Sequence, residues 1–307
     1  MKISDSDLFF RLHTASDSHR IVSMINRDPN HLLNGIGVTE FEQDLDEPNG
    51  RIREHTFVVE LGQVTAGYFS LCFVERSSHT DVYCFGTVDM DWRRRGIGTA
   101  IFKFIFKRLQ GIANQEASPV HFCHRAVSLI AGETACGVDF GMKEQSTLEI
   151  LCLKNRSDLN DINRSAPFQF RSPALADAEV WADIYNDAFG GNKRAESVIH
   201  EFQSASFNPD LYLLGMNNSG EPIGLVSSLL RGTGARIPTL AVRRDWQRQG
   251  AGKALLSEIL RRLQHTAVDY IRLSVESTNK SAKTLYFKNG FQPEYNRINY
   301  AAVCLPD

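Results

Sequence analysis

One stretch of this chain occurs twice. Residues 86–103 read GTVDMDWRRRGIGTAIFK and residues 240–257 read LAVRRDWQRQGAGKALLS, so the second copy follows the first by 154 positions. The two copies share seven identical pairs: Val88/Val242, Asp91/Asp245, Trp92/Trp246, Arg94/Arg248, Gly96/Gly250, Gly98/Gly252 and Ala100/Ala254. A repeat at about half the chain length indicates a tandem duplication. The 307 residues are therefore expected to form two similar domains, residues 1–155 and 165–307.

In each half the duplicated stretch joins a strand to a helix. The second half has the buried strand ARIPTLAV followed by the amphipathic helix GKALLSEILRRLQ, and the first half has DVYCFGTVD followed by GTAIFKFIFKRLQ. Strand-like segments precede each unit and another strand follows it. This order predicts an α/β fold, with helices flanking a mixed, largely antiparallel sheet. The polar segment NRSDLNDINRSAP is expected to link the halves.

The turn between strand and helix in the second half is suited to an anion. A helix start offers unpaired backbone N–H groups at the positive end of the helix dipole, and Gly250 and Gly252 would let a phosphate approach the backbone. A Walker A loop is excluded, because Gln247 stands where its first glycine is required and Ala254 where Ser or Thr is required. A tight turn without a ligand is the alternative at this point.

Composition excludes several classes of protein. A net charge of −2 does not indicate a nucleic-acid or polybasic membrane protein, and no apolar run reaches the roughly 20 residues of a membrane helix. The first residues lack a signal-peptide core. The six cysteines show no CxxC pair or regular spacing, so we expect reduced thiols, a cytoplasmic protein and no metal. The chain is expected to be a monomer or a homodimer.

A second informative stretch, RLSVESTNKSAKTLYFKNGF, covers residues 272–291. It reads as a strand followed by a short helix, which Asn279 can cap and Gly290 can end in the left-handed conformation. Tyr286 lies on this helix. Helix capping alone can explain why Asn279 and Gly290 stand at these positions. An ordinary place in the hydrophobic core is a weaker explanation for Tyr286.

Together these stretches resemble the GNAT superfamily of N-acetyltransferases. The second half carries the whole pattern over about residues 235–291, as a strand ending in LAV, then QRQGAG from Gln247 to Gly252, and then Asn279, Ala282, Tyr286, Gly290 and Phe291. The first half resembles it over about residues 82–106, through RRRGIG from Arg93 to Gly98. The tandem layout is similar to that of mycothiol synthase.

The resemblance implies acetyl-CoA as co-substrate. It places the pyrophosphate on backbone N–H groups of the loop, the pantetheine arm beside the strand TLAV, the N–H of Val242 on the thioester carbonyl and Tyr286 as the general acid. The residues that it assigns to the cofactor in the second half are Leu240, Ala241, Val242, Gln247, Arg248, Gln249, Gly250, Ala251, Gly252, Lys253, Asn279, Ala282 and Tyr286. In the first half they are Val88, Arg93, Arg94, Gly96 and Gly98.

The general base is less defined. Many members of the family place a glutamate in the strand before the loop, where this chain has Pro238. Glu276, at the end of the next strand, is the nearest carboxylate in sequence and is our candidate for base or proton relay. The alternative is an exposed charge at the end of a strand, which is the more common reason for such a residue. Asp183, Asp187 and His200 are weaker candidates in the helical region. Trp181, Ile184 and Tyr185 lie at helical spacing, which is typical of an amphipathic helix.

The first half departs from the pattern, because no tyrosine occurs between Tyr83 and Tyr185. If Gly141 and Met142 correspond to Gly290 and Phe291, then Gly137 replaces Tyr286 and Ile130 replaces Asn279. We therefore expect a degenerate, non-catalytic first domain that retains acetyl-CoA or only shapes the acceptor site.

The predicted function is transfer of an acetyl group to a primary amine of a small molecule in the C-terminal domain. A protein or peptide amine as the acceptor, and a CoA-binding module without catalysis, are the alternatives.

Overall fold

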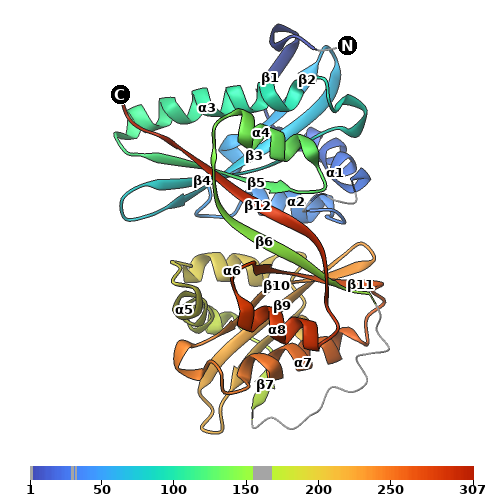
Figure 1. Cartoon of the computed structure of the whole chain (residues 1–307), viewed down its shortest axis with the longest axis vertical. Helices are drawn as coiled ribbons and strands as arrows, with labels where there is room; N and C mark the ends of the chain where they lie inside the picture. Colours follow the sequence, from blue (N-terminus) through green and yellow to red (C-terminus); the bar gives the residue numbers. More distant parts are fainter. Residues whose placement is uncertain (1–2, 29–30, 32, 155–167) are drawn as a thin grey trace. The chain divides into compact units, whose positions relative to one another are not determined.

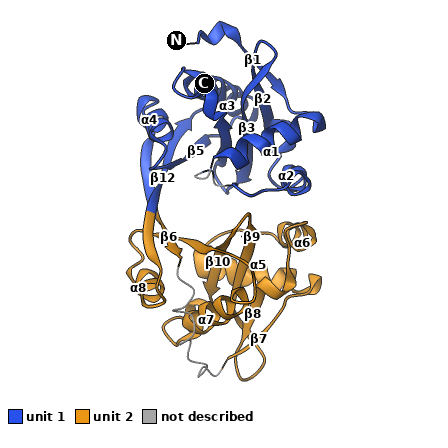
Figure 2. Cartoon of the chain, turned by 90° about the vertical axis from the view of Figure 1, so that its right-hand side faces the viewer, with its two compact units in different colours: residues 1–148, 295–307 blue, residues 149–294 orange. Residues whose placement is uncertain are grey.

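The structure is a computed structural model that describes residues 3–28, 31, 33–154 and 168–307; the predicted linker, residues 155–167, lies outside the described residues. The chain forms two compact units (Figures 1 and 2). Unit 1 consists of residues 1–148 and 295–307, and unit 2 of residues 149–294. In the described part of the chain, no helix has the length and apolar character needed to cross a membrane.

Unit 1 contains a mixed sheet with the strand order β1-β2-β3-β4-β5-β12. Neighbouring strands are antiparallel except for β4 and β5, which are parallel. Its elements are β1 (Leu8–Leu12), α1 (Ser18–Arg27), α2 (Val38–Leu45), β2 (Thr56–Leu61), β3 (Val64–Glu75), β4 (Thr80–Val88), α3 (Ile97–Glu116), β5 (Val120–Val127), α4 (Ala131–Asp139) and most of β12 (Gln292–Cys304).

Unit 2 repeats this plan with the strand order β6-β11-β10-β9-β8-β7. The pair β10 and β11 is parallel, as β4 and β5 are in unit 1, and the pairs from β7 to β10 are antiparallel. Its elements are the end of β6 (Lys143–Leu153), β7 (Gln169–Arg171), α5 (Ala178–Phe189), α6 (Ala195–Gln203), β8 (Tyr212–Met216), β9 (Pro222–Arg231), β10 (Gly234–Val242), α7 (Ala251–Leu263), β11 (Tyr270–Glu276) and α8 (Lys280–Lys288). The mixed, largely antiparallel α/β fold predicted from the sequence is confirmed.

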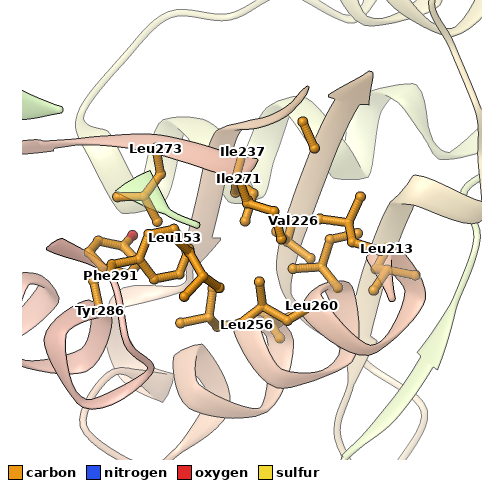
Figure 3. Packing of buried hydrophobic residues seen from close by; sticks show 14 of the residues in the cluster. Leu153, Leu213, Val226, Ile237, Leu256, Leu260, Ile271, Leu273, Tyr286 and Phe291 are labelled. Carbon is orange, nitrogen blue, oxygen red and sulfur yellow. The ribbon is translucent and has the colours of Figure 1, made fainter. Parts of the chain in front are cut away.

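Helices cover both faces of each sheet. In unit 2, Leu256 and Leu260 on the apolar face of α7 pack with Val226 and Ile271 of the sheet (Figure 3). Side chains of α5 and α6, including the buried Trp181, pack in a separate cluster with residues of β8, β9 and β10. Burying an apolar stripe on each face explains why these segments are amphipathic helices. Unit 1 is built the same way, with α3 in one cluster and α1 and α2 in another.

The compact units differ from the two consecutive halves expected from the sequence, because each includes a strand from the other half. Residues Arg297 to Cys304 of β12 pair with β5 of unit 1, and Tyr300 lies in the core of that unit. Leu151 and Leu153 of β6 lie in the core of unit 2. These apolar side chains determine where each strand belongs, whatever its position in the sequence.

Candidate functional site

Strands β10 and β11 of unit 2 diverge at one end. Their parallel pairing covers only Gly234 to Ile237, although β10 continues to Val242. On its other side β10 stays paired with β9 up to Val242, with a bulge between Arg236 and Thr239. A bulge bends the strand that contains it, and here it coincides with the point of divergence. Among the described residues, no strand pairs with the other backbone edge of the last residues of β10.

The N–H of Val242 belongs to this free edge. The N–H of Arg243 donates to the carbonyl of Ile223 at 2.9 Å, and Val242 lies opposite Gly224. Hydrogen-bonded and non-bonded pairs alternate in an antiparallel ladder, so the N–H of Val242 points away from β9. Leu240, two residues earlier, has the same orientation. These two N–H groups can bind an extended amide chain as an additional strand would bind.

The loop after β10 has an unusual backbone. A short 3-10 turn (Arg244–Trp246) is followed by Arg248 with φ 61° and Gly250 with φ 90°, and α7 begins at Ala251. A positive φ is uncommon for a residue other than glycine. When residues of positive φ alternate with residues of negative φ, successive backbone N–H groups point toward one concave side of the loop. Such a concave side favours the binding of an anion.

Two glutamine side chains hold this loop. Gln247 Nε2 donates to the carbonyl of Val242 at 3.1 Å, and Gln249 Nε2 donates to the carbonyl of Asp245 at 2.6 Å. Both amide groups are therefore engaged with the chain itself. The backbone N–H of Gln247 is engaged as well, because it donates to the carbonyl of Arg244 at 3.2 Å. Gln249 can therefore offer its backbone N–H to a ligand, whereas Gln247 positions the loop.

The surroundings of the loop leave room for a ligand. A Cβ at Gly252 would meet Leu240, Val242 and Leu285 at no less than 3.8 Å, which is ordinary contact. Packing within the chain therefore does not require glycine at this position. The exposed side chains of Arg248 and Lys253 have no hydrogen-bond or ion-pair partner among the described residues. They add positive charge beside the N-terminus of α7.

Helix α8 provides the predicted acid. Asn279 caps it, because its side-chain oxygen accepts the N–H of Ala282 at 3.0 Å, and Gly290 with φ 83° ends it. Tyr286 is 8% exposed and packs edge-on against Phe291, with ring centroids 6.0 Å apart (Figure 3). Burial raises the pKa of Tyr286 to about 12. The phenol is therefore neutral at physiological pH and able to donate a proton.

The candidate bases are placed less favourably. Glu276 is exposed at the end of β11, Pro238 is exposed within β10, and Asp183 is exposed on α5. Asp187 accepts the N–H of Arg244 at 2.7 Å, so its carboxylate joins α5 to the loop. His200 is half-buried on α6. None of these groups combines burial with a free carboxylate or imidazole in the described structure.

Three aromatic and aliphatic residues of α5 are explained without a ligand. Trp181 and Ile184 are buried in the α5–α6 core, as their helical spacing predicted. Tyr185 packs edge-on against Phe189 at 4.9 Å, and the ammonium of Lys193 lies 5.3 Å from its ring centre.

Unit 1 repeats the geometry of the loop. Its β4 pairs with β5 only up to Cys84, and Arg94 and Gly96 have φ of 63° and 96°. Arg93 takes the role of Gln247, because its Nε donates to the carbonyl of Val88 at 3.0 Å. The guanidinium of Arg93 also forms an ion pair with the buried Asp28 at 2.5 Å. A Cβ at Gly98 would meet only Cys136 Sγ, at 3.7 Å.

Helix α4 of unit 1 differs from α8 in side chains, not in backbone. The N–H of Met142 donates to the carbonyl of Gly137, and the N–H of Phe291 donates in the same way to that of Tyr286. This supports the predicted correspondence of Gly137 with Tyr286. A Cβ at Gly137 would lie 2.8 Å from the ring of Tyr300, so β12 fills the space of the absent side chain.

A half-buried carboxylate in α4 was not predicted from the sequence. In the same alignment Glu133 replaces Ala282, and its Oε2 accepts the N–H of Val127 at 2.7 Å. Burial raises the pKa of Glu133 to about 7. The sequence did contain an indication of this carboxylate, because the charged Glu133 stands where the second half has the small residue Ala282. The contact between Asp187 and Arg244 had no such signal.

Comparison with known proteins agrees with this geometry. Residues 178–291 match the model of the acetyltransferase (GNAT) family. A segment of 66 residues is 38% identical to the [ribosomal protein bS18]-alanine N-acetyltransferase of Escherichia coli (strain K12), and it covers 22% of this chain. The chain spans only 45% of the length of that enzyme.

Two solved structures share the fold over almost the whole chain. A tandem GNAT protein from the clavulanic acid biosynthesis pathway has a TM-score of 0.73 and 15% identity, and covers 98% of this chain and 99% of its own. A GCN5-related N-acetyltransferase from Sphaerobacter thermophilus has a TM-score of 0.71 and 18% identity, with coverage of 100% and 98%. At these identities the likeness concerns the fold alone.

Proposed function

We propose that unit 2, whose residues 178–291 match the model of the acetyltransferase (GNAT) family, transfers an acetyl group from acetyl-CoA to a primary amine. The observation that carries the proposal is the presence in one unit of a diverging strand, a loop with positive φ at Arg248 and Gly250, and a buried neutral Tyr286. Each of these three features serves a different part of acetyl transfer.

The chain's residues have distinct roles in the proposal. N–H groups of the loop from Arg248 to Lys253 hold the pyrophosphate, with the dipole of α7 behind them. The free edge of β10 binds the pantetheine amides, and the N–H of Val242 donates to the thioester oxygen, where negative charge develops. The thioester of acetyl-CoA supplies the acetyl group.

Tyr286 completes the proton balance. As the C–N bond forms and the C–S bond breaks, the sulfur needs a proton and the amine loses one. Tyr286 donates its proton to the sulfur and regains one from the amine nitrogen through solvent, with Glu276 at the end of β11 as the candidate relay. A phenol of pKa about 12 is a weaker acid than a thiol, so the donation must be coupled to the loss of the amine proton.

Among the described residues of unit 2, no Asp, Glu or His side chain is buried, and this limits the acceptor. An α-amino group whose carboxyl is in an amide bond has a pKa near 8 and a lysine side chain one near 10.4, so at pH 7 the free-base fraction of the former is roughly 200-fold larger. We propose that the acceptor is a small molecule with a weakly basic primary amine, such as an α-amino group next to an amide.

A peptide N-terminus is the second candidate acceptor. It has the same weakly basic amine, and the segment of 38% identity belongs to an enzyme that acts on an alanine of a ribosomal protein. Both candidate acceptors therefore have an amine of low pKa. They differ in the size of the molecule that carries this amine.

The experiment is release of CoA thiol from acetyl-CoA in the presence of a panel of amines. The panel contains free amino acids and their amides, alkylamines of higher pKa and short peptides that begin with alanine. We expect turnover with α-amines that rises with pH up to the pKa of the acceptor and does not decline below pH 10, because Tyr286 stays protonated there. No acetyl-CoA-dependent thiol release with any amine would contradict the enzymatic proposal and favour a CoA-binding module.

A further inference from the structure

Three potential metal ligands meet in unit 1, far along the strands from the loop. His79 immediately precedes β4, Asp81 is its second residue, and Asp81 lies opposite His121 of β5. The RRRGIG loop follows the other end of β4. The cluster therefore lies at the N-terminal ends of the two parallel strands and takes no part in the acetyl-CoA geometry.

The ligand atoms converge on one point. Asp81 Oδ1 lies 3.2 Å from His79 Nε2 and 3.8 Å from His121 Nδ1, and all three atoms lie within 4.8 Å of one another. Zn²⁺ binds imidazole nitrogen and carboxylate oxygen at about 2.0–2.2 Å, which places neighbouring ligand atoms of a tetrahedral site about 3.3–3.5 Å apart. The distances of 3.2 and 3.8 Å from Asp81 Oδ1 are close to these values, and a bound ion would require the two stacked rings to turn toward it.

The remaining atoms of two of these side chains are already bound elsewhere. Arg76 Nε donates to Asp81 Oδ2 at 2.7 Å, which leaves Oδ1 for the centre of the cluster. Ser78 Oγ lies 3.1 Å from His79 Nδ1, which leaves Nε2 for the centre. Metal-binding histidines and carboxylates in proteins are usually oriented by such outer hydrogen bonds.

The cluster also contains a cation and a pair of stacked rings. Arg76 forms an ion pair with Asp81, and the rings of His79 and His121 stack with centroids 3.9 Å apart and planes 21° apart. Both imidazoles present a ring nitrogen to the same carboxylate oxygen, Asp81 Oδ1. Neutral imidazole is the form that binds metals.

We propose that His79, Asp81 and His121 bind one divalent transition-metal ion of the zinc class. Two histidines and one carboxylate with a free position are typical of Zn²⁺ and Fe²⁺ sites, whereas Mg²⁺ and Ca²⁺ prefer oxygen ligands alone. The side chains of His79, Asp81 and His121 are 26%, 14% and 32% exposed, so water can take the free position. The bound ion joins the β3–β4 turn to β5 and stabilises unit 1.

The test uses the full chain, stripped with a chelator and dialysed against Zn²⁺. We expect one zinc per chain by atomic spectroscopy and a higher melting temperature with zinc than without it. The double variant His79→Ala/His121→Ala should lose both effects. The control variant His19→Ala removes an exposed histidine of the same unit and should keep them. Ser78→Ala should weaken zinc binding by about 10–100-fold.

A second measurement separates this site from the six cysteines, all of them free in the structure. Co²⁺ in the full chain should show d–d absorption of nitrogen and oxygen ligands without a thiolate charge-transfer band. If the double variant does not fold, Asp81→Asn replaces it, since the amide keeps the shape of the carboxylate. Equal zinc content in wild type and variant, a thiolate band, or no retained zinc in the wild type would each overturn the proposal.

Discussion

Tyr286 and Gly137 show how a single residue separates the two units. Both occupy the same position relative to the helix end, since their carbonyls accept the N–H of Phe291 and Met142. In unit 2 the position supplies a phenol whose pKa burial raises to about 12. In unit 1 it has no side chain, and the ring of Tyr300 fills the space. General-acid chemistry is therefore expected in unit 2 alone.

Replacement of Tyr286 by Phe tests this assignment. The change removes one hydroxyl and leaves the ring packed against Phe291, so the melting temperature should change little. Loss of a general acid lowers kcat by about 10²–10⁴-fold. Tyr270→Phe is the matched control, because Tyr270 lies at the start of β11, away from the diverging end, and its loss should leave kcat unchanged. Full turnover by Tyr286→Phe would assign the proton donor to another group or to water.

At the scale of the element, helix α4 differs from α8 by a half-buried charge. Glu133 stands where α8 has Ala282, and burial raises the pKa of this carboxyl from 4.5 to about 7. The folded state therefore favours the protonated carboxyl more than the unfolded state does. The stability linked to Glu133 is complete below pH 4.5 and decreases as the pH rises from 4.5 to 7.

Glu133→Gln should remove this pH dependence. The amide oxygen can still accept the N–H of Val127, and no charge has to be buried. We expect the variant to be more stable than the wild type at pH 8 by about 1–3 kcal/mol, since one pKa unit corresponds to about 1.4 kcal/mol. At pH 4.5 the two should be nearly equal. Urea unfolding at both pH values measures this, with the exposed Glu54→Gln as control; an equal difference at both values would contradict the ionisation argument.

The strand and the helix on either side of the loop could be predicted from the sequence, but the divergence of β10 from β11 could not. The periodicity of ARIPTLAV and GKALLSEILRRLQ predicted β10 and α7 closely, because a strand and an amphipathic helix leave different local patterns. The early end of the pairing between β10 and β11 coincides with a bulge that contains Pro238. A proline within a strand signals a bulge or an unpaired edge, but it does not show which neighbouring strand departs. The cluster of His79, Asp81 and His121 was missed for a similar reason, since only strand register places His121 beside Asp81.

At the scale of the whole molecule, the exchanged strands link the folding of the two halves. The duplication predicted two similar α/β units correctly. It did not predict that β6 and β12 would each complete the sheet of the other half, because local patterning shows that a segment is a strand but not which sheet it joins. Leu151 and Leu153 are buried in unit 2 although they precede the linker.

Fragments of the chain test the exchange. A fragment of residues 165–307 lacks β6, and the loss of two buried leucines should cost about 3–6 kcal/mol. A fragment of residues 149–294 keeps both leucines and forms the whole of unit 2. We expect the second fragment to unfold cooperatively and to bind acetyl-CoA, and the first to lack a cooperative transition. The opposite result, with a stable 165–307 fragment, would show that β6 is dispensable for unit 2.

The duplication also raises the question of how many acetyl-CoA molecules the chain binds. Both loops have the same positive φ values, at Arg94 and Gly96 and at Arg248 and Gly250. Binding of a phosphate needs these backbone N–H groups but no general acid. However, Glu133 introduces a half-buried carboxyl into α4 at the position of Ala282, which the family resemblance assigns to the cofactor. We therefore expect a second site in unit 1 that is weaker than the site in unit 2.

Calorimetry with acetyl-CoA on the full chain can resolve the two sites. Gly98→Glu and Gly252→Glu form a matched pair, because a Cβ at either position meets only ordinary contacts and neither has the positive φ of Gly96 or Gly250. We expect Gly252→Glu to abolish the tight site, and Gly98→Glu to abolish only a site at least about tenfold weaker, a difference of about 1.4 kcal/mol. Glu133→Ala should strengthen the weaker site. A single site that only Gly252→Glu removes, and that Glu133→Ala does not supplement, would show that the first loop no longer binds acetyl-CoA.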